Sequence, residues 1–140
     1  LWSRGLGDVY KRQLRTSGIG DALADVLSDT GMPVIIAAFV IAAALRVAQG
    51  SATVALTTTA ALVAPLVAAT PGLSEFDLCF IVVAIAGGAT VLSHVNDSGF
   101  WLVSRFLEMD EKTTLKTWTV METLLGGIAF ILAVIGSLIL

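Results

Sequence analysis

A cluster of polar side chains interrupts one of the most apolar stretches of this chain. The stretch SHVNDSG holds the single histidine, His94, together with Asn96, Asp97 and Ser98. Histidine side chains in general change charge near neutral pH, and an aspartate in a low-dielectric cavity can be protonated in the same range, so His94 or Asp97 would suit a proton carrier. Any of the last three polar residues could instead cap a restarting helix, with Gly99 relieving the backbone. A buried hydrogen-bonded network without transport chemistry is the alternative interpretation.

A second group of small polar residues, QGSAT, separates two apolar arms. Gly50 permits a sharp reversal of the chain, and the hydroxyls of Ser51 and Thr53 can cap the helix that follows. The start of that helix offers free N–H groups and a positive dipole end, which together form a favourable site for a carboxylate. Gln49 adds an amide at the same place. A plain capped loop in water is the alternative.

Two charged residues also fall in apolar surroundings. Arg46 lies three residues before QGSAT, with no acid nearby in its helix. An arginine at the centre of a membrane costs about 2.5–3.5 kcal/mol on insertion scales, so it should face a cavity or a partner. That partner is a substrate anion or an acid such as Asp97, unless the side chain extends to the interface. Glu122, about one turn into the last apolar run, is expected near the interface and carries little functional weight.

Other kinds of site are not indicated. One histidine, one cysteine and scattered acids do not make a metal-binding set, and the sequence has no nucleophile–base–acid arrangement or phosphate loop. We therefore expect no enzyme, no metal and no cofactor.

The composition is that of a membrane protein. The 140 residues are 56% hydrophobic and 14% charged, against about 25% charged residues in a soluble domain, and the mean hydropathy is +0.92. The net charge of −3 and the lack of a basic patch argue against nucleic acid as a partner. The expected partner of the surface is the lipid bilayer.

The apolar runs predict the elements that position the polar groups. Each arm within residues 33–69 is shorter than the ~20 residues that a spanning helix needs. One over-long helix, two short spans and a re-entrant hairpin are all conceivable, and the hairpin explains both the shortness and the small polar turn. Residues 75–107 read as one helix broken at 93–99, and residues 117–140 as a final transmembrane helix. An amphipathic connector is predicted at 14–32.

Positive charge predicts the orientation. The loop at residues 105–116 holds Arg105, Lys112 and Lys116, whereas residues 70–77 hold no basic side chain. By the positive-inside rule, the former loop is cytoplasmic and the latter external.

Residues 1–13 are set aside. SRGLGDVYKRQ, at residues 3–13, resembles the translation of a sequencing-library adapter, in which a transposon end reads DVYKRQ. A natural basic juxtamembrane segment is the alternative. An adapter origin implies that the chain is the carboxy-terminal piece of a longer protein.

Three long motifs resemble a known family. RVAQGSATVALTTTAALVAP, GGATVLSHVNDSGFWLV and TLKTWTVMETLLGG are similar to the carboxy-terminal third of the gluconate:H⁺ symporter (gluconate permease) family, over residues 17–140. The resemblance implies a multi-pass permease of the bacterial inner membrane that takes up gluconate or a related sugar acid, with the proton as coupling ion and no other cofactor. It also implies a broad ion-transporter superfamily built from two inverted repeats.

The resemblance implies an all-α membrane fold: the carboxy-terminal inverted-repeat half, with a re-entrant helical hairpin, a discontinuous helix and a final transmembrane helix. In such carriers the hairpin and the unwound helix meet at the substrate, so QGSAT and SHVNDSG are expected to face each other across a cavity. Asp97 or His94 would take the proton. The expected substrate-binding residues are Arg46, Gln49, Gly50, Ser51, Thr53, Asn96 and Ser98.

Other functions stay open at this point. A sodium-coupled or different organic-anion carrier is the main alternative. Related dicarboxylate carriers hold sodium in Ser-Asn-Thr turns, and GSAT lacks the asparagine, which argues against a sodium site. An ion channel lacks a filter signature here, and a structural subunit would not explain paired polar interruptions. An assembly of identical subunits is compatible with all of these. The first repeat, which would supply half of the site, is not in this sequence.

Overall fold

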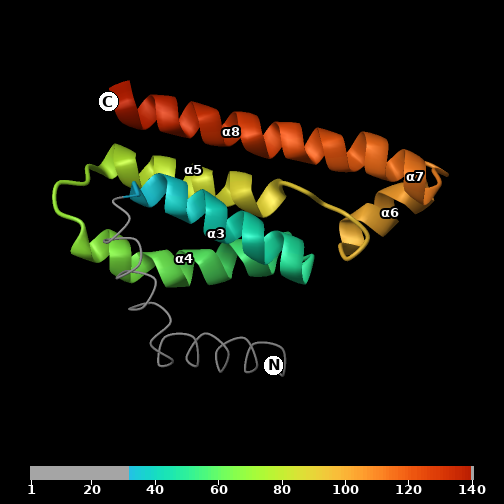
Figure 1. The fold of residues 1–140 in the computed structure, drawn as a ribbon, viewed down its shortest axis with the longest axis horizontal. Helices are drawn as coiled ribbons and strands as arrows, with labels where there is room; N and C mark the ends of the chain where they lie inside the picture. The colour runs from blue at the N-terminus through green and yellow to red at the C-terminus, as the bar shows by residue number, and fades with distance from the viewer. Residues whose placement is uncertain (1–31, 140) are drawn as a thin grey trace.

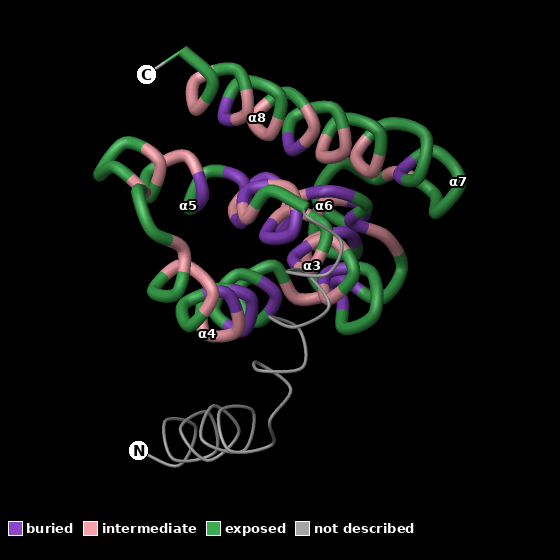
Figure 2. Tube along the Cα trace, turned by 60° about the vertical axis from the view of Figure 1, so that its left-hand side comes forward, coloured by how far each residue is buried: buried purple, intermediate pink, exposed green. Residues whose placement is uncertain are grey.

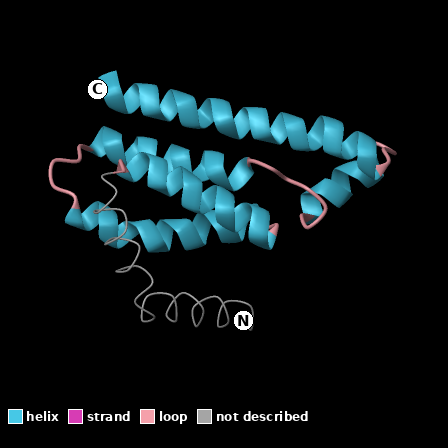
Figure 3. Ribbon diagram, in the orientation of Figure 1, coloured by secondary structure: helices cyan, strands magenta, loops and turns pink. Residues whose placement is uncertain are grey.

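The structure is a computed structural model that describes residues 32–139. The segment set aside at 1–13 and nearly all of the predicted connector at 14–32 lie outside the described residues. Every regular element within residues 32–139 is helical (Figure 3). The elements are α3 (Val34–Gln49), α4 (Ala52–Ala69), α5 (Glu75–Thr90), α6 (Ser98–Phe106), α7 (Glu111–Thr114), the π-helical turn η1 (Leu115–Thr119) and α8 (Val120–Ile139).

Helices α3 and α4 form an antiparallel hairpin whose turn lies at one end of the bundle (Figure 1). Gly50 ends α3 in the left-handed region, with a φ of 76°. Glycine adopts this conformation without the steric cost that a Cβ would add. Ser51 then caps α4 by accepting a hydrogen bond from the Val54 N–H. The two predicted apolar arms correspond to these helices.

Small residues allow α5 to pack closely between α3 and α8. A Cβ placed on Gly88 would lie 2.8 Å from the Ala42 Cβ, and a Cβ on Gly87 would lie 2.8 Å from the Gly126 carbonyl oxygen. The buried core is accordingly rich in alanine: Ile35, Ala38, Ala42, Val63, Ile81, Ala84, Ile85 and Ala133. Close backbone approach through small residues is the usual packing mode of helices in membranes.

The helix that begins with α5 is interrupted at residues 91–97, two residues earlier than predicted. Leu92 takes a left-handed conformation with a φ of 55°. Asp97 accepts a hydrogen bond from the Gly99 N–H and thereby caps α6. Gly99 is therefore an ordinary helical residue of α6, and the prediction that it relieves the backbone of the break is wrong.

The last helix is longer than predicted. It runs without interruption from Glu111 through α7, η1 and α8 to Ile139, because Asp110 caps it and starts it early. A hydrogen bond from the Thr113 side chain, which has the larger effect, and one from the Thr113 backbone N–H hold the pKa of the Asp110 carboxyl below its ordinary value.

Two helical segments of the described chain are long and apolar enough to cross a membrane: Ala52–Ala69 and Glu111–Ile139. Helix α8 turns most of its surface outward, whereas the buried residues gather on the inner faces of α3, α4 and α5 (Figure 2). Its exposed residues are large and apolar, among them Leu124, Leu125, Ile128, Ile131 and Leu132. Such a face is suited to lipid or to other membrane helices.

Candidate functional site

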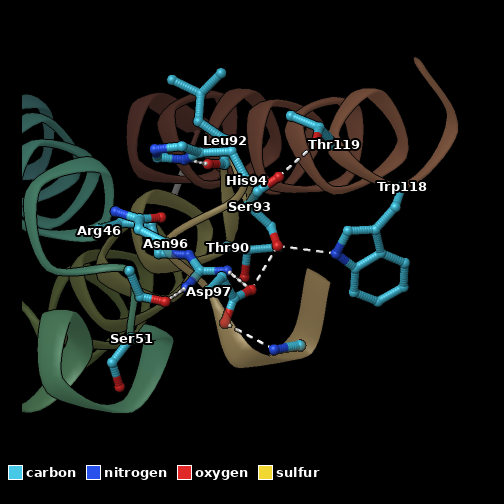
Figure 4. A network of polar contacts seen from close by, with 12 residues as sticks. Arg46, Ser51, Thr90, Leu92, Ser93, His94, Asn96, Asp97, Trp118 and Thr119 are labelled. Atoms are coloured by element: carbon cyan, nitrogen blue, oxygen red, sulfur yellow. Dashed lines mark hydrogen bonds and ion pairs between the residues drawn. The ribbon is translucent and has the colours of Figure 1, made fainter. Parts of the chain in front are cut away.

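The hairpin turn and the helix break meet, and their polar side chains gather in one network (Figure 4). Arg46, in the last turn of α3, extends to the break, where its Nη2 lies 2.5 Å from the Asp97 Oδ2. The Asn96 side-chain amide donates to the Val47 carbonyl oxygen at 2.7 Å. A Cβ on Gly50 would lie 2.6 Å from the Asn96 carbonyl carbon. The two stretches are thus in direct contact, and the expectation of a cavity between them is wrong for this arrangement of the chain.

Asp97 is the centre of the polar network. Its Oδ2 accepts hydrogen bonds from Arg46 and from the Ser93 hydroxyl, and its Oδ1 accepts the Gly99 N–H at 3.0 Å. Both residues of the ion pair are buried, with 3% of Arg46 and 8% of Asp97 exposed. A buried ion pair is retained only if its geometry and additional hydrogen bonds offset the loss of water, and Asp97 meets that condition.

Arg46 is less fully satisfied than its partner. Its Nη1 donates to the Gly50 carbonyl oxygen, so one guanidinium joins the hairpin turn to the break. Its Nε is buried and has no hydrogen-bond partner among residues 32–139. A guanidinium presents its donors in a fork that matches a carboxylate, so a spare N–H at this place can donate to a further oxygen.

The start of the last helix binds the break from the other side. The Trp118 indole N–H donates to the Ser93 hydroxyl at 2.8 Å, and the Thr119 hydroxyl donates to the Ser93 carbonyl oxygen. The Leu92 N–H donates to the Thr123 hydroxyl at 3.2 Å. The π-turn η1 contains Trp118 and Thr119, and such turns occur frequently at functional sites. Sequence reasoning missed these contacts, although the run KTWT at the start of an apolar span was a signal.

The other predicted binding residues lie around this centre without joining the network. Ser51 accepts from the Val54 N–H at 3.3 Å and is the cap of α4. Thr53 lies in the first turn of α4, where its carbonyl oxygen accepts the Thr57 hydroxyl, so its predicted capping role is wrong. Gln49 and Ser98 are exposed at the end of α3 and the start of α6.

His94 is held by its own segment. Its Nδ1 lies 2.7 Å from the Leu92 carbonyl oxygen. A carbonyl oxygen only accepts, so Nδ1 carries a proton in this contact, and Nε2 is left to accept or donate elsewhere. The ring does not contact the Asp97 carboxylate.

Within the described residues, no group of three or more histidine, cysteine, aspartate and glutamate side chains is placed to hold a metal ion. A cavity of about 610 Å³ lies between α6 and the start of the last helix, lined by residues such as Val103, Phe106, Leu107 and Met121. Its lining is almost wholly apolar, so it offers few hydrogen-bonding groups to a polar ligand.

Comparison with known proteins places these residues in a family. The model of a family described as GntP family permease matches residues 3–139. The match begins inside the segment at 3–13, so the adapter origin of that segment stays a prediction. No solved structure matches the chain.

Curated relatives cover nearly all of this chain. A low-affinity gluconate transporter of Escherichia coli (strain K12) is 47% identical over 131 residues, which are 94% of this chain and 29% of that protein. A gluconate permease of Pseudomonas aeruginosa is 39% identical over 136 residues, 97% of this chain and 30% of that protein. A gluconate permease of Bacillus subtilis (strain 168) is 42% identical over 130 residues, 91% and 28% respectively. The chain therefore spans less than a third of the length of each of these relatives.

Proposed function

We propose that this chain, which belongs to the GntP family of permeases, forms the carboxy-terminal part of a secondary transporter for gluconate or a related sugar acid. The complete protein would be a multi-pass protein of the bacterial inner membrane that couples uptake to proton entry. The names of the relatives, gluconate permease and low-affinity gluconate transporter, support the substrate. The buried Arg46–Asp97 ion pair, where the hairpin turn meets the helix break, is the observation that carries the mechanism.

The proposed architecture is one of two inverted repeats. Helices α3 and α4 form its re-entrant hairpin, and α5 with α6 form its discontinuous helix. The length of α3 supports this: its 16 residues are short for a full span of a bilayer that needs ~20, and the 18 residues of α4 lie near the lower limit for one. Broken helices at membrane depth are tolerated where they line a substrate site, as in many secondary transporters. The end that holds the α6–α7 loop faces the cytoplasm in this proposal.

The proposed substrate site is the surface of the ion pair. The carboxylate of a sugar acid would bind Arg46, whose Nε is unpartnered within the described chain, and the amino-terminal end of α4 at Gly50 and Ser51. Its hydroxyls would contact the polar residues at the rim: Gln49, Thr53, Asn96 and Ser98. The turn and the break must separate slightly to admit the ligand, because they are in direct contact in this structure.

Proton coupling then follows from charge. A substrate carboxylate that takes the place of Asp97 beside Arg46 leaves the Asp97 carboxylate without its cation. An unpaired charge in a buried site costs several kcal/mol, so Asp97 takes up a proton. The loaded site has the same net charge as the empty one, and both can cross the barrier. His94 is the second candidate for the proton, since the Nε2 of its ring is not used in the Leu92 contact.

Transport assays on the full-length protein test this proposal. Membrane vesicles with an imposed inward proton gradient should accumulate labelled gluconate saturably, and a protonophore should abolish the accumulation. Arg46→Gln should weaken gluconate binding, and Asp97→Asn should keep exchange of gluconate across the membrane while losing its dependence on the proton gradient. Glu108→Gln, an exposed loop substitution, is the control.

Two results would contradict the proposal. A wild-type protein that carries no sugar acid refutes the substrate. Proton-driven accumulation that survives both Asp97→Asn and His94→Ala refutes the coupling role of these residues. Uptake that does not saturate would indicate a channel instead.

A further inference from the structure

Helix α8 carries one charged side chain, Glu122. Sequence reasoning gives it little weight because it lies near the start of the apolar run. In the structure it is half-buried, and Arg46 and Asp97 act on it electrostatically. An ionisable residue inside a membrane helix is costly and is found mostly facing a bundle interior or a polar pathway.

The contacts of its neighbours show which way this face of α8 points. Thr119, three residues before Glu122, donates to the Ser93 carbonyl oxygen of the break. Gly126, four residues after it, approaches the end of α5, where a Cβ on Gly126 would lie 3.2 Å from the Val91 N. Residues three and four apart lie on one face of a helix. Glu122 therefore lies on the face of α8 that packs against the end of α5 and the beginning of the break.

The charged groups around this face are few. Those that act on Glu122 are Arg46 of α3 and Asp97 of the break. The break also holds His94, whose ring contacts the Leu92 carbonyl oxygen. The acids of α5, Glu75 and Asp77, lie in its first turn at the opposite end of that helix. Within residues 32–139 the one ion pair is that of Arg46 with Asp97. The Glu122 carboxyl is thus the acid of this region that has no cation of its own.

The two acids have opposite surroundings, and this difference assigns them different roles. Asp97 is held as a carboxylate by Arg46, Ser93 and the Gly99 N–H. A carboxyl on an apolar helix without such donors is more stable in its protonated form, because burial disfavours the charged form. Before the substrate binds, the Asp97 carboxylate is held by its hydrogen-bond partners, so an arriving proton binds to Glu122 instead.

We propose that Glu122 is the proton-relay residue of the transporter: it binds the coupling proton first and passes it to Asp97 when a substrate carboxylate displaces Asp97 from Arg46. In this step the Glu122 O–H bond breaks and an O–H bond forms on the Asp97 carboxylate. Asp97 gives up this proton on the cytoplasmic side when the substrate leaves and Arg46 pairs with it again, and Glu122 regains a proton from water on the external side, so that one proton enters with each substrate anion. The inference rests on the proposed function, since it needs a substrate that binds Arg46.

The test separates proton transfer from substrate binding in the full-length protein. Glu122→Gln should lower kcat for proton-driven gluconate uptake on the order of 10²-fold, the usual contribution of a positioned proton-transfer group. It should leave KM and gluconate counterflow near the wild-type values, because exchange of bound substrate needs no net proton movement. Glu111→Gln, an exposed acid in the same continuous helix, is the matched control and should change neither quantity.

The outcomes distinguish the inference from the proposed function. A kcat for Glu122→Gln equal to that of the control, with wild-type uptake intact, overturns the relay and leaves the transporter proposal standing. Absent wild-type uptake contradicts the proposed function instead. If Glu122→Gln does not reach the membrane, Glu122→Asp carries the test: its shorter, more acidic carboxyl should move the pH profile of kcat to lower pH by about 0.4 units. An unmoved profile overturns the relay.

Discussion

Gly50 offers the sharpest test of the contact between the hairpin turn and the helix break. It has a φ of 76°, and a Cβ at this position would lie 2.6 Å from the Asn96 carbonyl carbon and 2.8 Å from the Asn96 Cγ. Carbon atoms in ordinary contact lie about 3.5–4.0 Å apart. Gly50→Ala must therefore both strain the backbone of the turn and push it away from the break.

The two costs can be separated because a second glycine bears only one of them. Gly72 has a φ of 84°, and a Cβ there would meet nothing within 4 Å. Its substitution by alanine should cost about 1–2 kcal/mol, the price of a left-handed residue with a Cβ. Gly50→Ala should cost that amount and a further 1–3 kcal/mol or so for the overlap. The difference between the two variants isolates the contact.

The assay measures unfolding and transport on the same preparations. Thermal unfolding of the full-length protein in detergent gives the stability difference, and gluconate uptake in vesicles gives activity. Gly50→Ala should lose uptake to a greater extent than its stability alone explains, because the displaced turn weakens the bond from Asn96 to the Val47 carbonyl and shifts the carbonyl that Arg46 binds. Gly72→Ala should keep uptake.

Equal losses of stability in the two alanine variants, with uptake retained in both, would refute this reasoning. Such a result would mean that the turn does not pack on the break in the functional protein, and the proposed site would lose its geometric basis.

Further predictions concern the other contacts. Gly126→Ala should destabilise the protein by about 1–3 kcal/mol, because the added Cβ would overlap α5. Gly127→Ala should be neutral or stabilising in the same unfolding assay, because a Cβ at Gly127 would meet nothing within 4 Å. Asp97→Asn should cost about 3–5 kcal/mol because it leaves Arg46 charged and unpaired, and a double substitution with Arg46→Met should recover much of that loss. The pKa of Asp110 is lowered, so the cap that its carboxylate forms on α7 stabilises the protein above the ordinary aspartate pKa of about 4 and is lost as the pH falls below that value. Hydrogen exchange at the start of α7 should therefore rise at low pH. Asp110→Asn should remove this pH dependence.

Much of the site can be predicted from the sequence, because polar residues inside an apolar segment have few structural explanations. Polar residues that are costly in a membrane predict the turn at Gly50 and the break near Asp97. They also predict a buried partner for Arg46, which the sequence leaves open between Asp97 and a substrate anion. The direct contact between turn and break was not predictable, since it depends on how closely α3 and α5 approach. That approach is set by Gly88 against Ala42, a packing detail that hydropathy does not encode.

The exact form of the break also escaped prediction, for a reason specific to irregular backbone. Three adjacent residues could each cap α6, and only the fold selects Asp97, by giving it Arg46 as a second partner. The left-handed residue is Leu92 and not a glycine. Its strain is maintained by long-range hydrogen bonds, which no local pattern reports.

Those long-range bonds explain why the last helix belongs to the site. The break exposes backbone groups that no helix satisfies, and at membrane depth each unsatisfied group would cost several kcal/mol. Side chains of the last helix satisfy two of them: the Leu92 N–H binds the Thr123 hydroxyl, and the Ser93 carbonyl binds the Thr119 hydroxyl. Any movement of the break that admits a substrate must therefore carry the start of the last helix with it or break these bonds. Glu122 lies between those two threonines, so the same movement that opens the ion pair changes the surroundings of the acid that we propose as its proton relay.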